Sequence, residues 1–298
     1  MHETQLTEDR PRFAFLRRRS VKFIAAGAMS LGLAAGMVAL AGPASADEIG
    51  QAPTAANITG NGNFAVATVN ISSSVAGFGG GIAYYPNTTG TFPVIAMSPG
   101  YTAAWSSISW LGPRVASWGF VVVGIETNSR FDQPTSRGTQ LIAALDWAVN
   151  SSPTQVRSRV DGSRRGVAGH SMGGGGTLSA LSRQSGSLIK AGVPLAPWNQ
   201  DKSWGEVTEA VMIVGGSADS TAPDAQHSIP FYNSLGGQKG FVEIAGAGHL
   251  FPTSANAIVS RAIVSWFKRF LNNDARFTPF TCGFASVSGV GQHRTNAC

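Results

Sequence analysis

A serine flanked by glycines stands where an apolar segment runs into a glycine-rich one. Segment 169–173, GHSMG, follows the short apolar run 166–168 and precedes 174–178, GGGTL, whose small residues suit a closely packed helix start. Glycines at both ends leave room for a sharp turn between strand and helix that lifts the Ser171 hydroxyl above a sheet. Gly-x-Ser-x-Gly alone is a loose pattern, and a serine in a glycine-rich loop is the alternative. The flanking segments favour the turn.

Apolar runs alternate with segments of helical spacing along most of the chain. Such alternation is typical of a mostly parallel sheet with helices on both faces. Together with the serine turn it predicts an α/β-hydrolase fold, and the short connection 198–209 gives no sign of a helical lid. Strands are predicted at 63–70, 78–85, 92–97, 120–125, 166–170, 191–195, 211–214 and 241–244, and helices at 135–150, from Ser171 to about 184, and at 254–271.

The first 46 residues are typical of an export leader. Basic residues at 17–22 precede an apolar run at 23–40, and Ala44-Ser45-Ala46 suits a cleavage site. We expect residues 1–46 to be removed and 47–298 to form a single catalytic domain that is secreted to the outside of the cell. A single membrane anchor is the alternative, since the run approaches the roughly 18 residues that span a bilayer. Both the general secretory and the twin-arginine route remain open.

The charge of the chain gives no reason to expect nucleic acid as a partner. The full sequence has a net charge of +6, but residues 1–46 hold six of its Lys or Arg and three of its Asp or Glu. The remaining 16 basic and 13 acidic residues give a net charge of about +3, with no dense basic run. We expect a monomer without an obligate protein partner.

The two cysteines, Cys282 and Cys298, both lie near the C-terminus. In an exported protein such a pair predicts one disulfide, here tying down the tail. A metal site is disfavoured because the thiols are distant and the histidines are not clustered. A catalytic thiol at the end of a chain is also disfavoured.

A hydroxyl nucleophile needs a base and a carboxylate to orient that base. Asp219 follows the predicted strand 211–214, and His249 follows the predicted strand 241–244. Both therefore lie at carboxyl ends of strands, where such a sheet places its active site, and in the chain order Ser, Asp, His. We expect Ser171 to be the nucleophile, His249 the general base and Asp219 the carboxylate that fixes the histidine tautomer.

Other acids and histidines have less suitable positions. Asp224 follows Pro223 and is expected to be an acid at a helix start, and His227 beside it is expected to be structural or to line the cleft. The ring of His170, next to Ser171 in the turn, would point away from the nucleophile. His293 lies in the tail.

Two backbone amides would complete the site by binding an oxyanion. One is the amide of Met172, directly after the nucleophile, and the other is expected from Tyr101 in the loop that follows strand 92–97. The alternative for Tyr101 is a simple packing role. Trp198 follows another predicted strand, 191–195, so its ring would reach the same face and could stack on a flat acyl group. A core tryptophan is the alternative there.

Several segments together resemble the actinobacterial cutinase and polyester hydrolase family, which includes enzymes that degrade poly(ethylene terephthalate). They are 98–101 (SPGY), 169–176 (GHSMGGGG), 196–198 (APW), 227–233 (HSIPFYN) and 266–270 (WFKRF), and the likeness extends from about residue 57 to 298. The resemblance implies a secreted, lidless α/β-hydrolase that needs no cofactor. It implies cleavage of esters in cutin, in aliphatic and some aromatic polyesters, and in short to medium acylglycerols.

The site residues that the resemblance implies agree with those inferred from the chain itself. They are Ser171, Asp219 and His249 as the catalytic residues, Tyr101 and Met172 as the oxyanion amides, Trp198 as an aromatic clamp and Cys282–Cys298 as a terminal disulfide. The resemblance therefore adds the substrate class, with an insoluble polyester or cutin surface and small esters as the expected partners.

Two features depart from the family. Leu250 follows His249 where many relatives have phenylalanine, so one wall of the cleft lacks a ring, and the tail is shorter. Carboxylates that bind calcium in some members have no clear match, and we expect no required metal. A lipase or general carboxylesterase with little activity on solid polyester is the main alternative. A protein that only adheres to waxy surfaces is a third possibility, disfavoured by the matched nucleophile and base.

Overall fold

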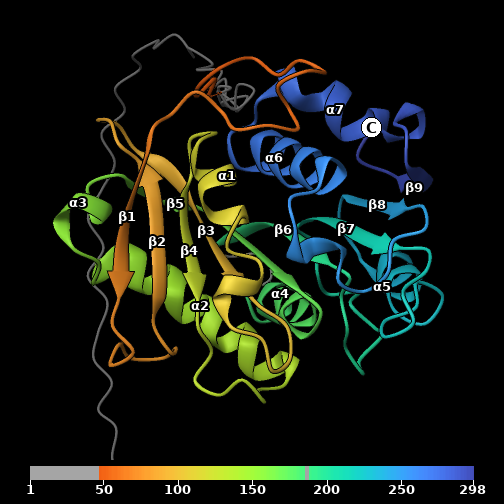
Figure 1. Cartoon of the computed structure of the whole chain (residues 1–298), viewed down its shortest axis with the longest axis horizontal. Coiled ribbons are helices and arrows are strands. Elements are labelled where there is room, and N and C mark those ends of the chain that lie inside the picture. The colour runs from red at the N-terminus through yellow and green to blue at the C-terminus, as the bar shows by residue number, and fades with distance from the viewer. Residues whose placement is uncertain (1–46, 185–187) are drawn as a thin grey trace, which may run out of the picture. The chain divides into compact units, whose positions relative to one another are not determined.

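The computed structural model describes residues 47–184 and 188–298, so the expected leader, residues 1–46, lies outside the described residues. Within them, nine strands form one sheet in the order β1-β2-β4-β3-β5-β6-β7-β8-β9 (Figure 1). Strands β3 to β8 are parallel, whereas β1, β2 and β9 run antiparallel to their neighbours. This mostly parallel sheet, covered by helices, confirms the predicted fold class. The strands are β1 (Val66–Ile71), β2 (Gly81–Pro86), β3 (Phe92–Ser98), β4 (Val121–Ile125), β5 (Val160–His170), β6 (Ile189–Leu195), β7 (Ala210–Gly216), β8 (Lys239–Ile244) and β9 (Val290–Thr295).

Helices cover both faces of the sheet, and a separate apolar core lies under each layer (Figure 1). Helices α1 (Leu111–Ala116) and α6 (Ala257–Leu271) pack on one face, while α2 (Pro134–Asn150), α4 (Met172–Arg183) and α5 (Ser228–Ser234) pack on the other. Strands β3, β4 and β7 are buried along their whole length because both of their faces are covered. Because side chains on both faces are buried, the sequences of these strands are continuously apolar. The short helices α3 (Thr154–Arg157) and α7 (Thr278–Cys282) lie at the periphery.

Helix α6 shows how the sequence sets an element. Asn256 caps its start, accepting hydrogen bonds from the amides of Ile258 and Val259 at 2.9 and 3.0 Å. Its inward face buries Trp266 and Phe267, each contributing about 1.5–3 kcal/mol by removal from water. The helix begins at Ala257, three residues later than predicted, because Asn256 is the residue whose side chain satisfies the free amides.

Asp224 differs from its expected role. Helix α5 begins at Ser228, preceded by His227, and has no acid in its first turn. Asp224 instead lies in a turn before the helix, where its carboxylate occupies the space beside Gly215 of β7. The prediction was wrong because the chain after Pro223 makes a turn before the helix starts.

The C-terminal tail is a strand, which the sequence analysis did not predict. Strand β9 pairs antiparallel with β8, with Gly240 opposite Thr295 and Val242 opposite His293. The expected disulfide between Cys282 and Cys298 joins the end of α7 to the residues just after β9. The tail is therefore held by a ladder of backbone hydrogen bonds and by a covalent link.

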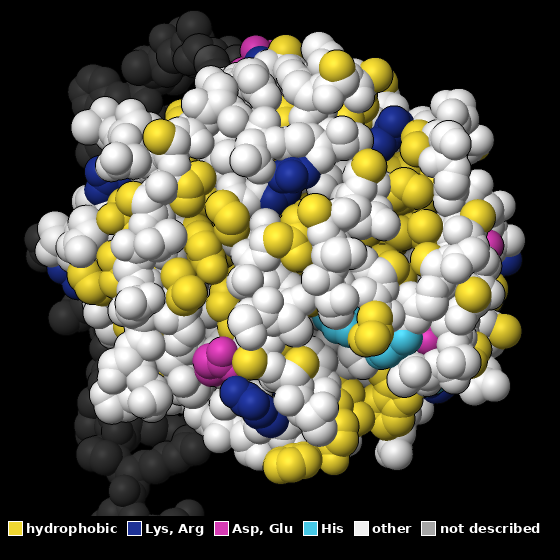
Figure 2. Space-filling model, viewed as in Figure 1, with side chains coloured by type: hydrophobic (Ala, Val, Ile, Leu, Met, Phe, Trp, Pro, Cys, Tyr) yellow, Lys and Arg dark blue, Asp and Glu magenta, His cyan; other side chains and the backbone are white. Residues whose placement is uncertain are grey.

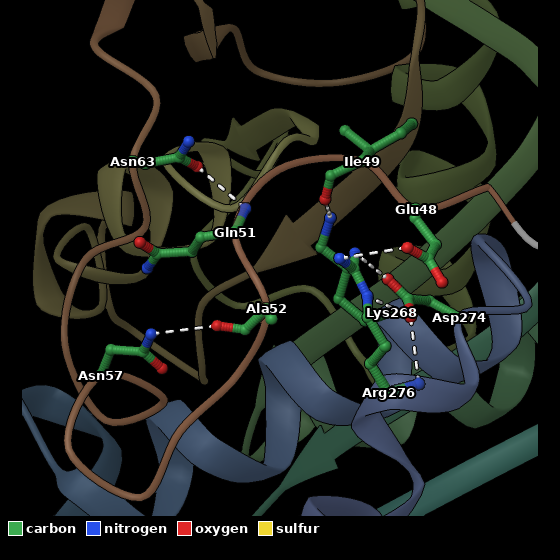
Figure 3. Close-up of polar contacts among 9 residues, drawn as sticks. All are labelled: Glu48, Ile49, Gln51, Ala52, Asn57, Asn63, Lys268, Asp274 and Arg276. Atoms are coloured by element: carbon green, nitrogen blue, oxygen red, sulfur yellow. Dashed lines mark hydrogen bonds and ion pairs between the residues drawn. The ribbon is translucent and has the colours of Figure 1, made fainter.

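Residues 47–49 lie beside the C-terminal part of α6 and the turn after it, as Figure 3 shows. The ammonium group of the fully buried Lys268 donates a hydrogen bond to the Ile49 carbonyl at 2.6 Å. Arg276 pairs with the buried Asp274 at 2.7 Å and reaches Glu48 at 3.4 Å. These contacts fix the start of the described chain to a segment more than 200 residues away.

Candidate active site

The turn at Ser171 has the strained backbone that the sequence predicts. Ser171 lies between β5 and α4 with φ 56° and ψ −118°, a conformation that costs a non-glycine residue about 1–3 kcal/mol. A Cβ atom on Gly169 would lie 2.4 Å from the Gly173 carbonyl oxygen, and one on Gly173 would lie 2.2 Å from the Ser98 carbonyl oxygen. Only glycine fits at either position, so the two glycines make the turn possible.

Backbone hydrogen bonds on both sides hold Ser171 in this conformation. Its amide donates to the Leu195 carbonyl at 3.0 Å, which ties the turn to the end of β6. Its carbonyl accepts from the amides of Gly175 and Trp198, both at 2.9 Å. The strain is thus offset by three bonds to two neighbouring segments.

Ser171, His249 and Asp219 form a continuous chain of short contacts. The Ser171 Oγ lies 2.8 Å from His249 Nε2, and His249 Nδ1 lies 2.7 Å from Asp219 Oδ2. The other carboxylate oxygen of Asp219 accepts hydrogen bonds from the amides of Thr221 and Ala222 at 2.8 and 2.7 Å. These amides orient the carboxylate so that Oδ2 faces the imidazole. Because a carboxylate can only accept, Nδ1 carries the hydrogen and Nε2 is free to take the serine proton.

His170 supports the loop that carries His249. Its ring is buried, lies 5.0 Å from the His249 ring and donates from Nε2 to the His249 carbonyl at 2.9 Å. Burial, together with the nearby His249, lowers the pKa of His170 to about 4. His170 therefore stays neutral and holds the base in place without competing for its proton.

The two expected oxyanion amides belong to segments next to the nucleophile. Met172 is the first residue of α4, so its amide precedes the intrahelical hydrogen bonds. Gly100, just before Tyr101, lies close enough that a Cβ there would be 3.1 Å from the Ser171 Cβ. Neither the Tyr101 nor the Met172 amide donates a hydrogen bond to another residue in the described part of the chain. Both are therefore free to bind a developing oxyanion.

Trp198 is partly exposed and follows the end of β6. Its ring lies 5.9 Å from that of His227 at an angle of 31°. The Lys202 ammonium contacts Nδ1 of His227 at 2.8 Å. Burial, followed by the charge of Lys202, lowers the pKa of His227 to about 4, so this ring stays neutral and accepts from the lysine. Because its Nδ1 is bound to Lys202 and its ring packs beside Trp198, His227 is not placed to act as the base.

Apolar side chains surround the site at the surface. Figure 2 shows them gathered beside the histidine side chains that reach the surface. Tyr101 is 44% exposed and Leu250, next to the base, is 65% exposed. Phe131, which the sequence analysis missed, is 66% exposed and packs edge-on against Tyr101. The sequence feature that could have indicated Phe131 is that it is a single large aromatic residue within the polar loop 126–133.

The described residues also bear on metal binding and on membrane insertion. Among the residues that the structure describes, no group of three or more His, Cys, Asp or Glu side chains is arranged to hold a metal ion. No helix in the described ranges is both long and apolar enough to cross a membrane.

Comparison with known proteins places the chain in a family. The family model described as PET hydrolase-like matches residues 41–298. A cutinase of Thermobifida fusca (strain YX) is 44% identical over 281 residues, which cover 93% of this chain and 92% of that protein. A bis(hydroxyethyl) terephthalate hydrolase of Streptomyces coelicolor is 45% identical over 282 residues, covering 92% and 89%. Cutinase 1 of Thermobifida cellulosilytica is 47% identical over 239 residues, covering 79% and 90%. These matches confirm the resemblance found in the sequence, and the chain belongs to the PET hydrolase-like family.

Proposed function

We propose that this protein is a secreted serine ester hydrolase that cleaves cutin, polyesters and short to medium acyl esters. The observation that carries the proposal is the chain of contacts from Ser171 through His249 to Asp219 on a strained strand-to-helix turn. Its relatives named as cutinases and as a bis(hydroxyethyl) terephthalate hydrolase support a carboxylic ester as the substrate.

In the first half of the reaction, His249 Nε2 takes the proton of the Ser171 hydroxyl while Oγ attacks the ester carbonyl carbon. The carbonyl oxygen becomes negative and is bound by the amides of Tyr101 and Met172, each worth about 3 kcal/mol of transition-state stabilisation. Asp219 stabilises the imidazolium. The imidazolium then gives its proton to the leaving alcohol, and an acyl-enzyme remains on Ser171.

In the second half, His249 deprotonates a water molecule that attacks the acyl carbon. The same two amides bind the second oxyanion, and the proton returns from His249 to the Ser171 oxygen as the acid product leaves. Each step uses only the three side chains, the two amides, the ester and water, so no cofactor takes part.

The exposed apolar surface around the site favours a solid substrate. Tyr101, Trp198 and Leu250 border the nucleophile and can rest against a polymer chain. Leu250 also supports the alternative of a lipase or general carboxylesterase, because an aliphatic side chain beside the base offers no ring to stack on an aromatic acid.

The test compares the mature protein with its Ser171→Ala variant on a polyester film and on p-nitrophenyl butyrate. Serine-dependent release of soluble acid from the film, together with serine-dependent turnover of the soluble ester, is expected. Turnover of the soluble ester alone would favour the lipase or carboxylesterase. Failure of a phosphonate reagent to label Ser171 would favour a protein that only binds surfaces.

We further propose that residues 1–46 direct export and are removed, leaving 47–298 as one catalytic domain that acts as a monomer. The expected N-terminus of protein recovered from the culture medium is Asp47, read by N-terminal sequencing. Recovery of the uncleaved chain in the membrane fraction would contradict this and support an anchor.

A further inference from the structure

The loop that carries Tyr101 makes a tight and strained turn. The Ala103 amide donates to the Gly100 carbonyl at 3.2 Å, and Thr102 has a φ of 61°. This left-handed region is an outlier for a β-branched residue, which adopts it only where the surrounding structure imposes it. Contacts from outside the turn must therefore hold it, and with it the Tyr101 amide that is expected to bind the oxyanion.

Both ends of the segment around Tyr101 are bound to one fully buried arginine. Arg137 of α2 donates from Nη1 to the Pro99 carbonyl at 3.0 Å, two residues before Tyr101. From Nη2 it donates to the Arg130 carbonyl at 2.9 Å. The same carbonyl accepts from the Thr102 amide, one residue after Tyr101, at 2.7 Å. The guanidinium is thus a shared anchor for the residues before and after the oxyanion donor.

Three donors of Arg137 are engaged at once. Its Nε donates to the Asp132 carbonyl at 2.8 Å, so one planar fork binds three carbonyls. Burial lowers the pKa of Arg137 to about 10 against the opposing charge of Asp132, so the guanidinium is charged at neutral pH. Hydrogen bonds from a charged donor are about twice as strong as neutral ones. These bonds therefore fix the positions of three loop carbonyls relative to α2.

The backbone of Arg137 also packs against α4, whose first residue provides the other expected oxyanion amide. A Cβ on Gly176 of α4 would lie 2.8 Å from the Arg137 Cβ, and a Cβ on Gly138 of α2 would lie 3.0 Å from the Gly176 carbonyl oxygen. The glycines therefore bring the two helices into close contact at Arg137. Since α4 begins at Met172, Arg137 connects the helix with the Met172 amide to the loop with the Tyr101 amide.

We propose that Arg137 is a positioning residue, which holds the Tyr101 amide relative to the Met172 amide so that both bind the same oxyanion. The proposal rests on the proposed ester hydrolysis. Two amides stabilise the transition state only when both are aimed at one point before the charge develops. A displacement of about 1 Å can cost about 100-fold in rate. Without the guanidinium, the carbonyls of Pro99 and Arg130 lose their common anchor, and the strained turn is free to relax.

The test replaces Arg137 with methionine, which has a similar length and no donor, and measures hydrolysis of p-nitrophenyl butyrate. Both halves of the reaction use the same two amides, so acylation and deacylation slow together. We expect Arg137→Met to lower kcat about 10- to 100-fold and to leave KM within about 3-fold of the parent. The acid limb of the pH profile of kcat/KM is expected to stay in place, because the three bonds of Arg137 do not go to the catalytic side chains.

Butylboronic acid separates loss of the oxyanion site from a general loss of order. Its boron bonds the Ser171 oxygen while the serine proton passes to His249, and the tetrahedral adduct places one of its oxygens where the oxyanion forms. We expect Arg137→Met to raise the inhibition constant of this acid by about the same factor as it lowers kcat/KM. A change that affected only substrate binding would raise KM and leave this inhibition constant behind.

Gln140→Leu is the matched control. Gln140 is also a buried residue of α2 that binds the loop before the helix, accepting from the Asn128 amide and donating to the Asp132 carboxylate, both at 2.8 Å. Its third hydrogen bond goes to Ser136 of its own helix, so none of the three reaches the Tyr101 loop. We expect a kcat close to that of the parent.

Arg137→Lys is the second variant, and it carries the test if Arg137→Met does not fold. It keeps the buried charge, but a single ammonium cannot reach three carbonyls that are placed for a planar fork, so kcat is expected to fall here too.

A parent-like kcat in a folded Arg137→Met or Arg137→Lys protein would overturn the proposal. So would an equal loss in Gln140→Leu, or a boronic acid that binds Arg137→Met as tightly as the parent while kcat falls. If the parent itself shows no Ser171-dependent turnover, the proposed function is wrong, and this inference with it.

Discussion

Replacing Lys268 with methionine is expected to stabilise the protein at neutral pH and to lose that advantage as the pH rises. Lys268 lies in α6 with no exposed surface, and its ammonium bonds the Ile49 carbonyl (Figure 3). Burial lowers its pKa from 10.5 to about 7. Asp274 opposes this shift, but that carboxylate is already paired with Arg276, whose charge contributes to the lowering of the pKa.

The size of the effect follows from the two pKa values. An unfolded lysine keeps its proton up to about pH 10.5, whereas folded Lys268 loses it near pH 7. Between these values the unfolded chain binds more protons, so folding becomes more favourable as the pH rises, by up to about 1.4 kcal/mol per pH unit. The charged lysine therefore costs about 5 kcal/mol below pH 7 and nothing above 10.5.

Methionine has a similar length and no charge to bury, but it leaves the Ile49 carbonyl without a donor, at about 1–3 kcal/mol. We therefore expect Lys268→Met to gain about 2–4 kcal/mol at pH 6 and to lose about 1–3 kcal/mol near pH 10.5.

The measurement is denaturant unfolding of parent and variant at pH 6, 8 and 10, followed by tryptophan fluorescence. Lys190→Met, at an exposed lysine of β6, is the control and should show no comparable dependence on pH. A stability difference for Lys268→Met that is constant across the three pH values would refute the assignment of a buried lysine with a lowered pKa. So would a loss of several kcal/mol at pH 6.

Three further changes test other parts of the molecule. Burial, with Glu243 nearby, raises the pKa of Asp224 to about 6, so its ionisation above pH 6 destabilises the folded state; Asp224→Asn should gain about 3 kcal/mol at pH 8 and little at pH 4, by denaturant midpoints. Gly173→Ala places a Cβ 2.2 Å from the Ser98 carbonyl oxygen and should abolish turnover of p-nitrophenyl butyrate, so near-parent activity would mean that the turn is not strained as described. Cys298→Ser opens the terminal disulfide and should cost about 3 kcal/mol of unfolding free energy, a value that urea unfolding of the oxidised parent and the variant can check.

The sequence was most informative where function depends on local patterns. Ser171, Asp219 and His249 each follow an apolar strand, and in a parallel sheet the carboxyl ends of strands meet at one edge. Order along the chain and strand position were therefore enough to predict which side chains meet. The tight turn could likewise be predicted from Gly169 and Gly173 alone, because the turn needs residues without a side chain at these two positions.

Other features could not be predicted from the sequence, because they depend on backbone groups that every residue has and not on the type of side chain. Arg137 bonds three backbone carbonyls, and any residue presents a carbonyl, so no pattern marks Pro99 or Arg130 as its partners. Strand β9 has a polar sequence, VGQHRT, because it lies at the edge of the sheet and buries little. Its pairing depends on the backbone of β8 and not on its own hydrophobicity.

Strand β9 also changes which strand forms this edge of the sheet. An uncovered edge strand offers a row of free amide and carbonyl groups on which another chain can add a strand, a common route to aggregation. Here β8 would be that edge, and β9 occupies it along residues 240–244. Thermal fraying alone cannot carry β9 far from β8, because Cys298 remains bonded to Cys282. For as long as its surroundings stay oxidising, the protein thus keeps the more apolar β8 covered and presents the short, polar β9 at this edge instead.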